Sequence, residues 1–154
     1  MIAILFWFHL MGIAIWVGAS LLLPLAILPS AQALEPPARM KFMGALSGRL
    51  LRLVVLSILV VVITGALQAY GLKYVLGVNV ITIKIVVAVL MIANGLYLGY
   101  ALPRRAAALA PAPGTPPSPE LQRVVRLQVM HAWIQAGLSV IILLLVGILT
   151  APAV

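Results

Sequence analysis

Residues 2–28 read IAILFWFHLMGIAIWVGASLLLPLAIL, a stretch that contains no charged side chain. A helix that spans a lipid bilayer needs about 20 mostly apolar residues, and this stretch exceeds that length. It lacks the basic start of a secretory signal peptide and is longer than the apolar region of one, so we expect a retained helix. We expect Pro24 to kink this helix and Pro29 to lie near its end.

Three further stretches have the same apolar character. They comprise residues 53–70, 80–102 and 127–150, and Lys84 is the one charged side chain within them. Membrane-spanning strands would alternate polar and apolar residues over about ten positions, and these stretches do not. The sequence therefore predicts an all-α integral membrane protein, in which residues 1–154 form a single domain, an antiparallel bundle of four spanning helices.

The composition of the whole chain fits a lipid environment. Of the 154 residues, 65% are hydrophobic and 8% are charged, whereas a soluble domain has about 25% charged residues. The lack of cysteine excludes disulfides and iron–sulfur clusters. A net charge of +8 would suggest nucleic acid as a partner of a soluble domain. Here the basic residues flank apolar runs, so we expect anchors at the membrane surface and no nucleic-acid binding.

The distribution of basic residues predicts the orientation in the membrane. Eight of the ten lie in the connections between the first and second and between the third and fourth spans: Arg39, Lys41, Arg49, Arg52, Arg104, Arg105, Arg123 and Arg126. Cytoplasmic loops are enriched in Lys and Arg, so both termini are expected outside. We expect a multi-pass protein of a prokaryotic cytoplasmic membrane. The Pro/Ala-rich residues 103–118 predict a flexible cytoplasmic linker, and Ser118 is a suitable N-cap for the last helix.

Polar side chains inside the spans recur on single helical faces, which predicts that they face the centre of the bundle. In the last span Gln128, His131, Gln135 and Ser139 follow spacings of 3, 4 and 4. At about 1.5 Å per residue, His9 and His131 are expected in opposite halves of the membrane, with an offset on the order of 12 Å. We therefore expect two sites. The outer site would contain His9, Lys84 and Gln68, and the inner site His131, Gln135 and Asn94.

The chemistry of these residues favours a redox-active metal centre. His9 and His131 are the candidate metal ligands, because an imidazole can ligate a metal or relay a proton. No Asp or Glu lies in a span, which disfavours hard cations. Haem b or copper is then the expected cofactor, and Met91 and Met130 are candidate soft ligands. Each residue also has an explanation without a ligand: hydroxyls and amides join helices, Met and Trp pack, and Lys84 can extend its amine toward the outer surface.

Four stretches resemble the CopD copper-resistance membrane domain. They are His9 with Trp16-Val17-Gly18 and Pro24, GRLLRLVVLSILVVVITGALQAY at 48–70, ITIKIVVAVLMIANGLYLGYALP at 81–103, and VVRLQVMHAWIQAGLSVIILLLVGILTAPAV at 124–154. The first stretch is also similar to the start of HemJ, the membrane protoporphyrinogen oxidase. Asn94 stands where HemJ-like proteins tend to have a histidine.

This resemblance implies a four-helix bundle that handles copper or binds b-type haem, with His9 and Lys84 at positions important in HemJ. The predicted function is electron transfer or copper or haem handling, and whether the protein is an enzyme stays open. Two alternatives are a HemJ-like oxidase and a non-catalytic structural subunit of a larger membrane complex. Besides lipid, the expected partners are other membrane subunits or a redox partner. The expected cofactor contacts are His9, Trp16, Lys84, Asn94, His131 and Gln135.

Overall fold

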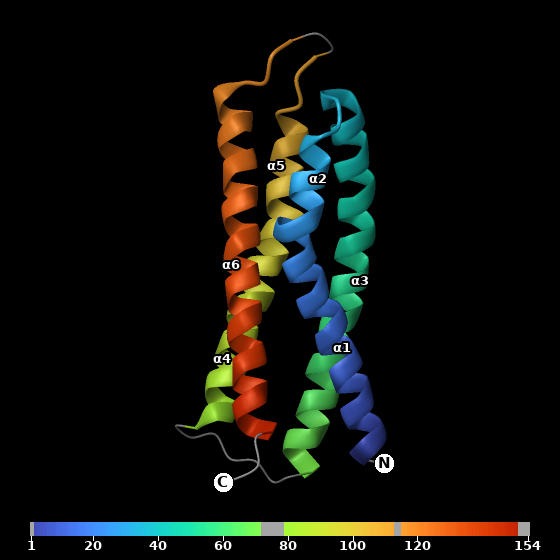
Figure 1. The fold of residues 1–154 in the computed structure, drawn as a ribbon, viewed down its shortest axis with the longest axis vertical. Coiled ribbons are helices and arrows are strands. Elements are labelled where there is room, and N and C mark those ends of the chain that lie inside the picture. Colours follow the sequence, from blue (N-terminus) through green and yellow to red (C-terminus); the bar gives the residue numbers. More distant parts are fainter. Residues whose placement is uncertain (1, 72–78, 113–114, 151–154) are drawn as a thin grey trace.

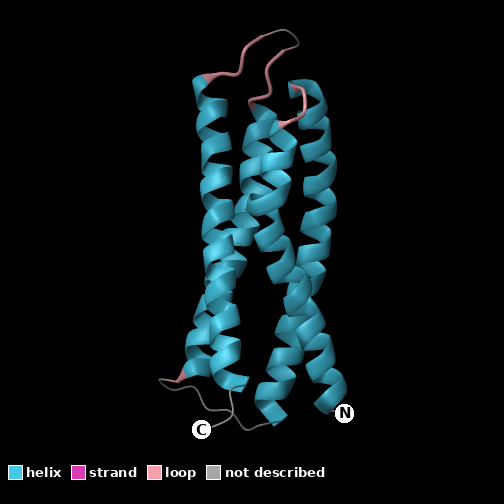
Figure 2. Cartoon of the chain, viewed as in Figure 1, coloured by secondary structure: helices cyan, strands magenta, loops and turns pink. Residues whose placement is uncertain are grey.

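The computed structural model describes residues 2–71, 79–112 and 115–150, and the regular structure in these ranges is entirely helical (Figures 1 and 2). Four of its helical stretches are long and apolar enough to cross a membrane: Ala3–Gln32, Pro36–Gly71, Val80–Ala108 and Pro119–Ile148. The prediction of an all-helical protein with four such stretches is confirmed.

The first stretch continues through both of its prolines. It consists of α1 (Ile2–Leu22), a π-helical turn η1 (Leu23–Ile27) and α2 (Leu28–Gln32). A proline lacks the backbone N–H and its ring clashes with the carbonyl one turn earlier. The wider π turn around Pro24 accommodates that ring, so the helix runs four residues past the predicted end at Leu28.

The other helices also extend beyond the predicted spans. They are α3 (Pro36–Gly71), then α4 (Val80–Leu96) with a π turn η2 (Tyr97–Ala101) and α5 (Leu102–Ala108), and finally α6 (Pro119–Thr150). The Ser118 hydroxyl accepts a hydrogen bond from the Leu121 N–H at 3.1 Å, as expected of an N-cap.

The linker is shorter than the predicted 103–118. The helix passes Pro103 and ends only at Ala108. The preceding turn η2 is π-helical, like the turn that contains Pro24, and the RAAA sequence that follows consists of strong helix formers. The proline content of 103–118 therefore wrongly predicted a flexible conformation for residues 103–108. Residues 113–114 of the predicted linker lie outside the described ranges.

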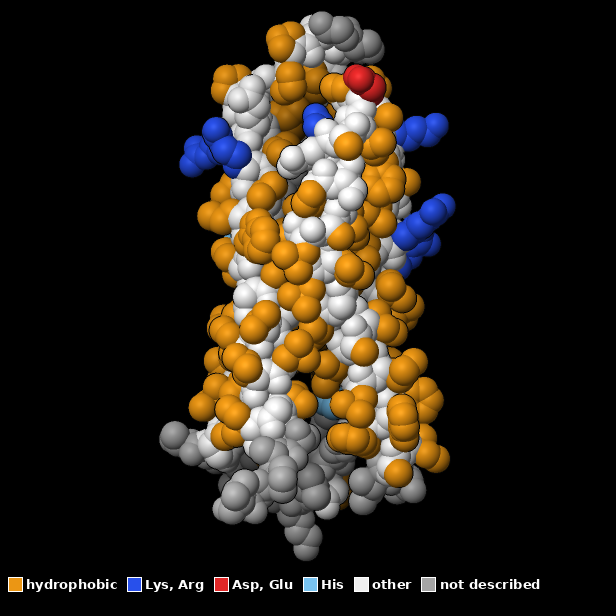
Figure 3. All heavy atoms as spheres, viewed as in Figure 1, with side chains coloured by type: hydrophobic (Ala, Val, Ile, Leu, Met, Phe, Trp, Pro, Cys, Tyr) orange, Lys and Arg blue, Asp and Glu red, His pale blue; other side chains and the backbone are white. Residues whose placement is uncertain are grey.

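The helices associate as two pairs. Helix α1 packs mainly against α3, and α4 packs mainly against α6, while α1 also touches α6. Close approach in the first pair requires Gly12, because a Cβ there would lie 2.7 Å from Val61 Cγ2 and 3.1 Å from the Ser57 carbonyl oxygen. The described starts of α1 and α4 and the end of α6 lie at one end of the long axis (Figure 1). The Lys and Arg side chains visible in Figure 3 lie toward the other end.

A layer of apolar side chains lies between three of the helices. Trp16, Met91 and Ile142 come from α1, α4 and α6 and are at most 5% exposed. Outside this layer, many large apolar side chains cover the outer faces of the helices. An apolar exterior of this extent is expected of a protein surrounded by lipid rather than water.

Candidate functional site

The inner polar residues form one hydrogen-bonded cluster between α4 and α6. The Asn94 Nδ2 donates to the His131 carbonyl at 3.0 Å and to Gln135 Oε1 at 2.7 Å. The Asn94 Oδ1 lies 2.6 Å from His131 Nδ1. The three residues expected at the inner site are thus brought together, because Asn94 reaches one turn of α6 that carries both partners.

The hydrogen bonds of this cluster determine which ring nitrogen of His131 carries the proton. The His131 carbonyl can only accept, so the NH2 side of the Asn94 amide faces it. The oxygen of that amide then accepts from a protonated His131 Nδ1. The Nε2 keeps its lone pair, and it makes no hydrogen bond with the described residues. The Tyr97 ring lies edge-on to the imidazole, with 4.8 Å between ring centroids.

The outer histidine is held by a hydroxyl on the neighbouring helix. His9 Nδ1 lies 2.9 Å from Thr64 Oγ1, and the Thr64 hydroxyl donates its one proton to the Val60 carbonyl at 2.6 Å. The Thr64 oxygen must therefore accept from a protonated His9 Nδ1, again leaving the lone pair on Nε2. Gly65 makes room for the ring, since a Cβ there would lie 3.1 Å from His9 Cε1.

Two more polar side chains belong to the outer half. Lys84 lies on α4, in the opposite helix pair, and it is near enough to His9 for a through-space electrostatic interaction between them. The Gln68 Nε2 on α3 is buried and has no hydrogen-bond partner among the described residues. Figure 3 shows a histidine ring in a crevice between helices, at the end away from the visible Lys and Arg side chains.

The two histidines belong to separate sites. Lys84 belongs to the outer site and Asn94 to the inner site, and both lie on α4. They are ten residues apart, which is about 15 Å along the helix axis. The apolar layer with Trp16 and Met91 lies between these levels. A single haem with both histidines as axial ligands does not fit this arrangement.

The donor sets are poor for a small metal ion. Within the described residues, no group of three or more His, Cys, Asp or Glu side chains is placed to hold one. Met91 is 1% exposed and packs in the apolar layer, while Met130 is 49% exposed on the outer surface of α6. Neither methionine supports copper binding in the way that we expected from the sequence.

Trp16 also belongs to the apolar layer. It is 3% exposed, and its Nε1 is buried without a hydrogen-bond partner among the described residues.

The sequence analysis assigned no role at the outer site to Thr64 and Gly65, which fix the His9 ring, and no role at the inner site to Tyr97. The spacing in the sequence could have identified Thr64 and Gly65. They follow Ser57 by seven and eight residues, so they lie on the same face of α3 as that buried serine, toward α1.

Comparison of the chain with protein-family models, with curated proteins and with solved structures found no match. The CopD-like resemblance therefore stays a prediction from the residues quoted for it.

Proposed function

We propose that the protein is an antiparallel four-span bundle in a prokaryotic cytoplasmic membrane, with both termini outside. The eight basic residues of the two connecting regions at one end support this orientation, because that end would face the cytoplasm. The outer site with His9 would then lie in the half of the membrane away from the cytoplasm.

We further propose that the outer site binds a haem b through His9, in the manner of a CopD-like membrane protein that transfers electrons or handles haem. The observation that carries this proposal is the His9–Thr64 hydrogen bond. Histidines that ligate metals usually donate their other ring N–H to a fixed acceptor, which sets the tautomer and the direction of the lone pair. His9 has this arrangement, with Thr64 as the fixed acceptor.

Haem fits the donors better than copper does. A haem iron needs one protein ligand, whereas a copper site built from His and Met needs several converging donors. Lys84, on the opposite helix pair, would neutralise a haem propionate, and the buried Gln68 amide would find a hydrogen-bond partner. The bound iron would supply one-electron chemistry, and the chain would hold, orient and shield it.

His131 is the less suitable ligand. Its ring also keeps the Nε2 lone pair, but its Nδ1 and its backbone carbonyl both bond to Asn94 on α4, and Tyr97 packs against the ring. We therefore assign to the Asn94–His131–Gln135 cluster the role of joining α4 to α6.

The visible spectrum of the purified protein, oxidised and dithionite-reduced, tests the haem assignment. We expect a Soret band that is lost in His9→Ala and retained in His131→Ala. Equal loss in both variants, or a band that survives His9→Ala, would contradict it. Copper by elemental analysis without a Soret band would favour copper passage. Neither signal, together with stable co-purification of other subunits, would favour the structural-subunit alternative.

A further inference from the structure

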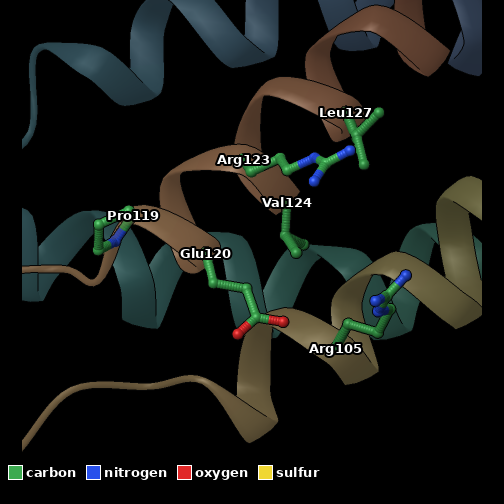
Figure 4. A pocket seen from close by; sticks show the side chains of 6 residues that line it. All are labelled: Arg105, Pro119, Glu120, Arg123, Val124 and Leu127. Atoms are coloured by element: carbon green, nitrogen blue, oxygen red, sulfur yellow. The ribbon is translucent and has the colours of Figure 1, made fainter.

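A cavity of about 460 Å³ lies between α5 and the first turns of α6, at the basic end of the molecule. Figure 4 shows it at close range. Its lining residues are Arg105, Pro119, Glu120, Arg123, Val124 and Leu127. None of these residues was a candidate site residue from the sequence.

The cavity has two cationic groups that the chain itself does not neutralise. The side chains of Arg105, Arg123 and Glu120 form no hydrogen bond or ion pair with the residues that the structure describes. Two guanidinium groups and one carboxylate leave a net charge of +1 in the lining. Guanidinium groups bind phosphate oxygens in a bidentate manner, which makes them common phosphate ligands.

The floor of the cavity is apolar. Val124 is 3% exposed and points from α6 toward α5, and Leu127, half-buried, marks the start of the apolar part of α6. Arg123 lies one turn before Leu127, so the cavity occupies the level at which charged residues give way to the lipid-facing surface. A ligand with a phosphate and an attached apolar tail matches this combination. A free anion would leave the floor unused.

We propose that this cavity is a binding site for a phosphate group, and that its occupant is the headgroup of an anionic phospholipid from the cytoplasmic leaflet. One phosphodiester carries one negative charge, which matches the net charge of the lining. Basic pockets between helices on this side of a membrane are suited to such headgroups. The site is independent of haem binding at His9.

Native mass spectrometry of the full chain in detergent, titrated with phosphatidylglycerol or phosphatidylcholine, tests this proposal. We expect phosphatidylglycerol to be retained in preference to phosphatidylcholine. The double variant Arg105→Gln/Arg123→Gln should bind it more weakly, by about fivefold for each arginine removed. Glu120→Gln should bind it more tightly, because it removes the only negative charge in the lining.

Arg39→Gln/Arg49→Gln on α3 is the matched control, since both residues are exposed and the pair removes the same charge from the same end. It should retain phosphatidylglycerol as the unmodified protein does. Equal weakening by the two double variants, or no weakening by either, would overturn the proposal. Thermal protection by inorganic phosphate alone, lost in Arg105→Gln/Arg123→Gln, would support the phosphate site while assigning it to a soluble anion.

Discussion

The two histidines have the same tautomer, but the polar groups around them differ in how many of their hydrogen bonds are formed. At the inner level, both amide hydrogens and the oxygen of Asn94 are bonded, and Gln135 Oε1 accepts one of these bonds. At the outer level, one hydroxyl holds His9, and the buried Gln68 amide nitrogen has no partner among the described residues. Among the described residues, the outer level therefore has a fully buried side-chain donor without a partner, whereas no fully buried side-chain nitrogen or oxygen of the Asn94 cluster lacks one.

This difference separates a structural role from a binding role. A buried polar group without a partner costs free energy, so the Gln68 amide would gain from a bound group that supplies one. A satisfied cluster between two helices needs no ligand to explain it. Each level has one histidine and one glutamine, but the pairing of their polar groups differs, and only the outer level includes a lysine. The three predictions that follow test that distinction, in order of decreasing effect.

Gly12→Ala is expected to have the largest effect, because it forces apart the α1–α3 pair that holds His9. The added methyl would clash with Val61 Cγ2 and with the Ser57 carbonyl oxygen, which is backbone and cannot turn aside. Overpacking of this kind costs about 1–3 kcal/mol, and we expect the upper part of that range. Thermal unfolding in detergent, followed by circular dichroism, measures it.

Gly18→Ala is the control for this prediction, since a Cβ at Gly18 meets nothing within 4 Å. It should leave the melting temperature unchanged or raise it slightly, because alanine is the better helix former. If Gly12→Ala melts at the same temperature as Gly18→Ala, the close α1–α3 contact described here is wrong.

Asn94→Leu should destabilise the protein by about 2 kcal/mol, because it removes three hydrogen bonds worth roughly 0.6 kcal/mol or somewhat more each. The variant should keep its Soret band, because the cluster lies about 15 Å from the level of His9. Gln128→Leu, another amide on the same stripe of α6, makes no hydrogen bond with the described residues and should change stability little. Loss of the Soret band in folded Asn94→Leu would place the cofactor at the inner level instead.

Much of the helical arrangement was predictable from the sequence, because apolar length and polar spacing are local properties of the chain. The 3, 4, 4 stripe of α6 was enough to bring His131 and Gln135 onto one face, and the depth of Asn94 placed it beside them. The linker was predicted less well. Pro103 lies within a helix because a π turn precedes it, and composition carries no information about such a turn.

The hydrogen-bond partners could not be predicted from the sequence in the same way. His9 and Thr64 are 55 positions apart, and their contact depends on how closely Gly12 lets α1 approach α3. The cavity between α5 and α6 depends on the continuation of the helix beyond Pro103, which the expected flexible linker would not provide. Features that arise from the packing of two helices need the register between them, and one sequence does not contain it.

Thr64→Val gives the smallest of the three effects and the most direct test of the outer site. Valine has nearly the same shape but cannot accept the hydrogen bond from His9 Nδ1, so the ring loses its fixed tautomer and orientation. Haem affinity should fall by about tenfold, which corresponds to about 1.4 kcal/mol, with a smaller change in the melting temperature than Asn94→Leu causes. Ser57→Ala, on the same face of α3, removes a buried hydroxyl that bonds only to its own helix, and it should leave haem affinity unchanged. If Thr64→Val and Ser57→Ala bind haem equally well, the hydroxyl does not position a ligand, and His9 then joins two helices as His131 does.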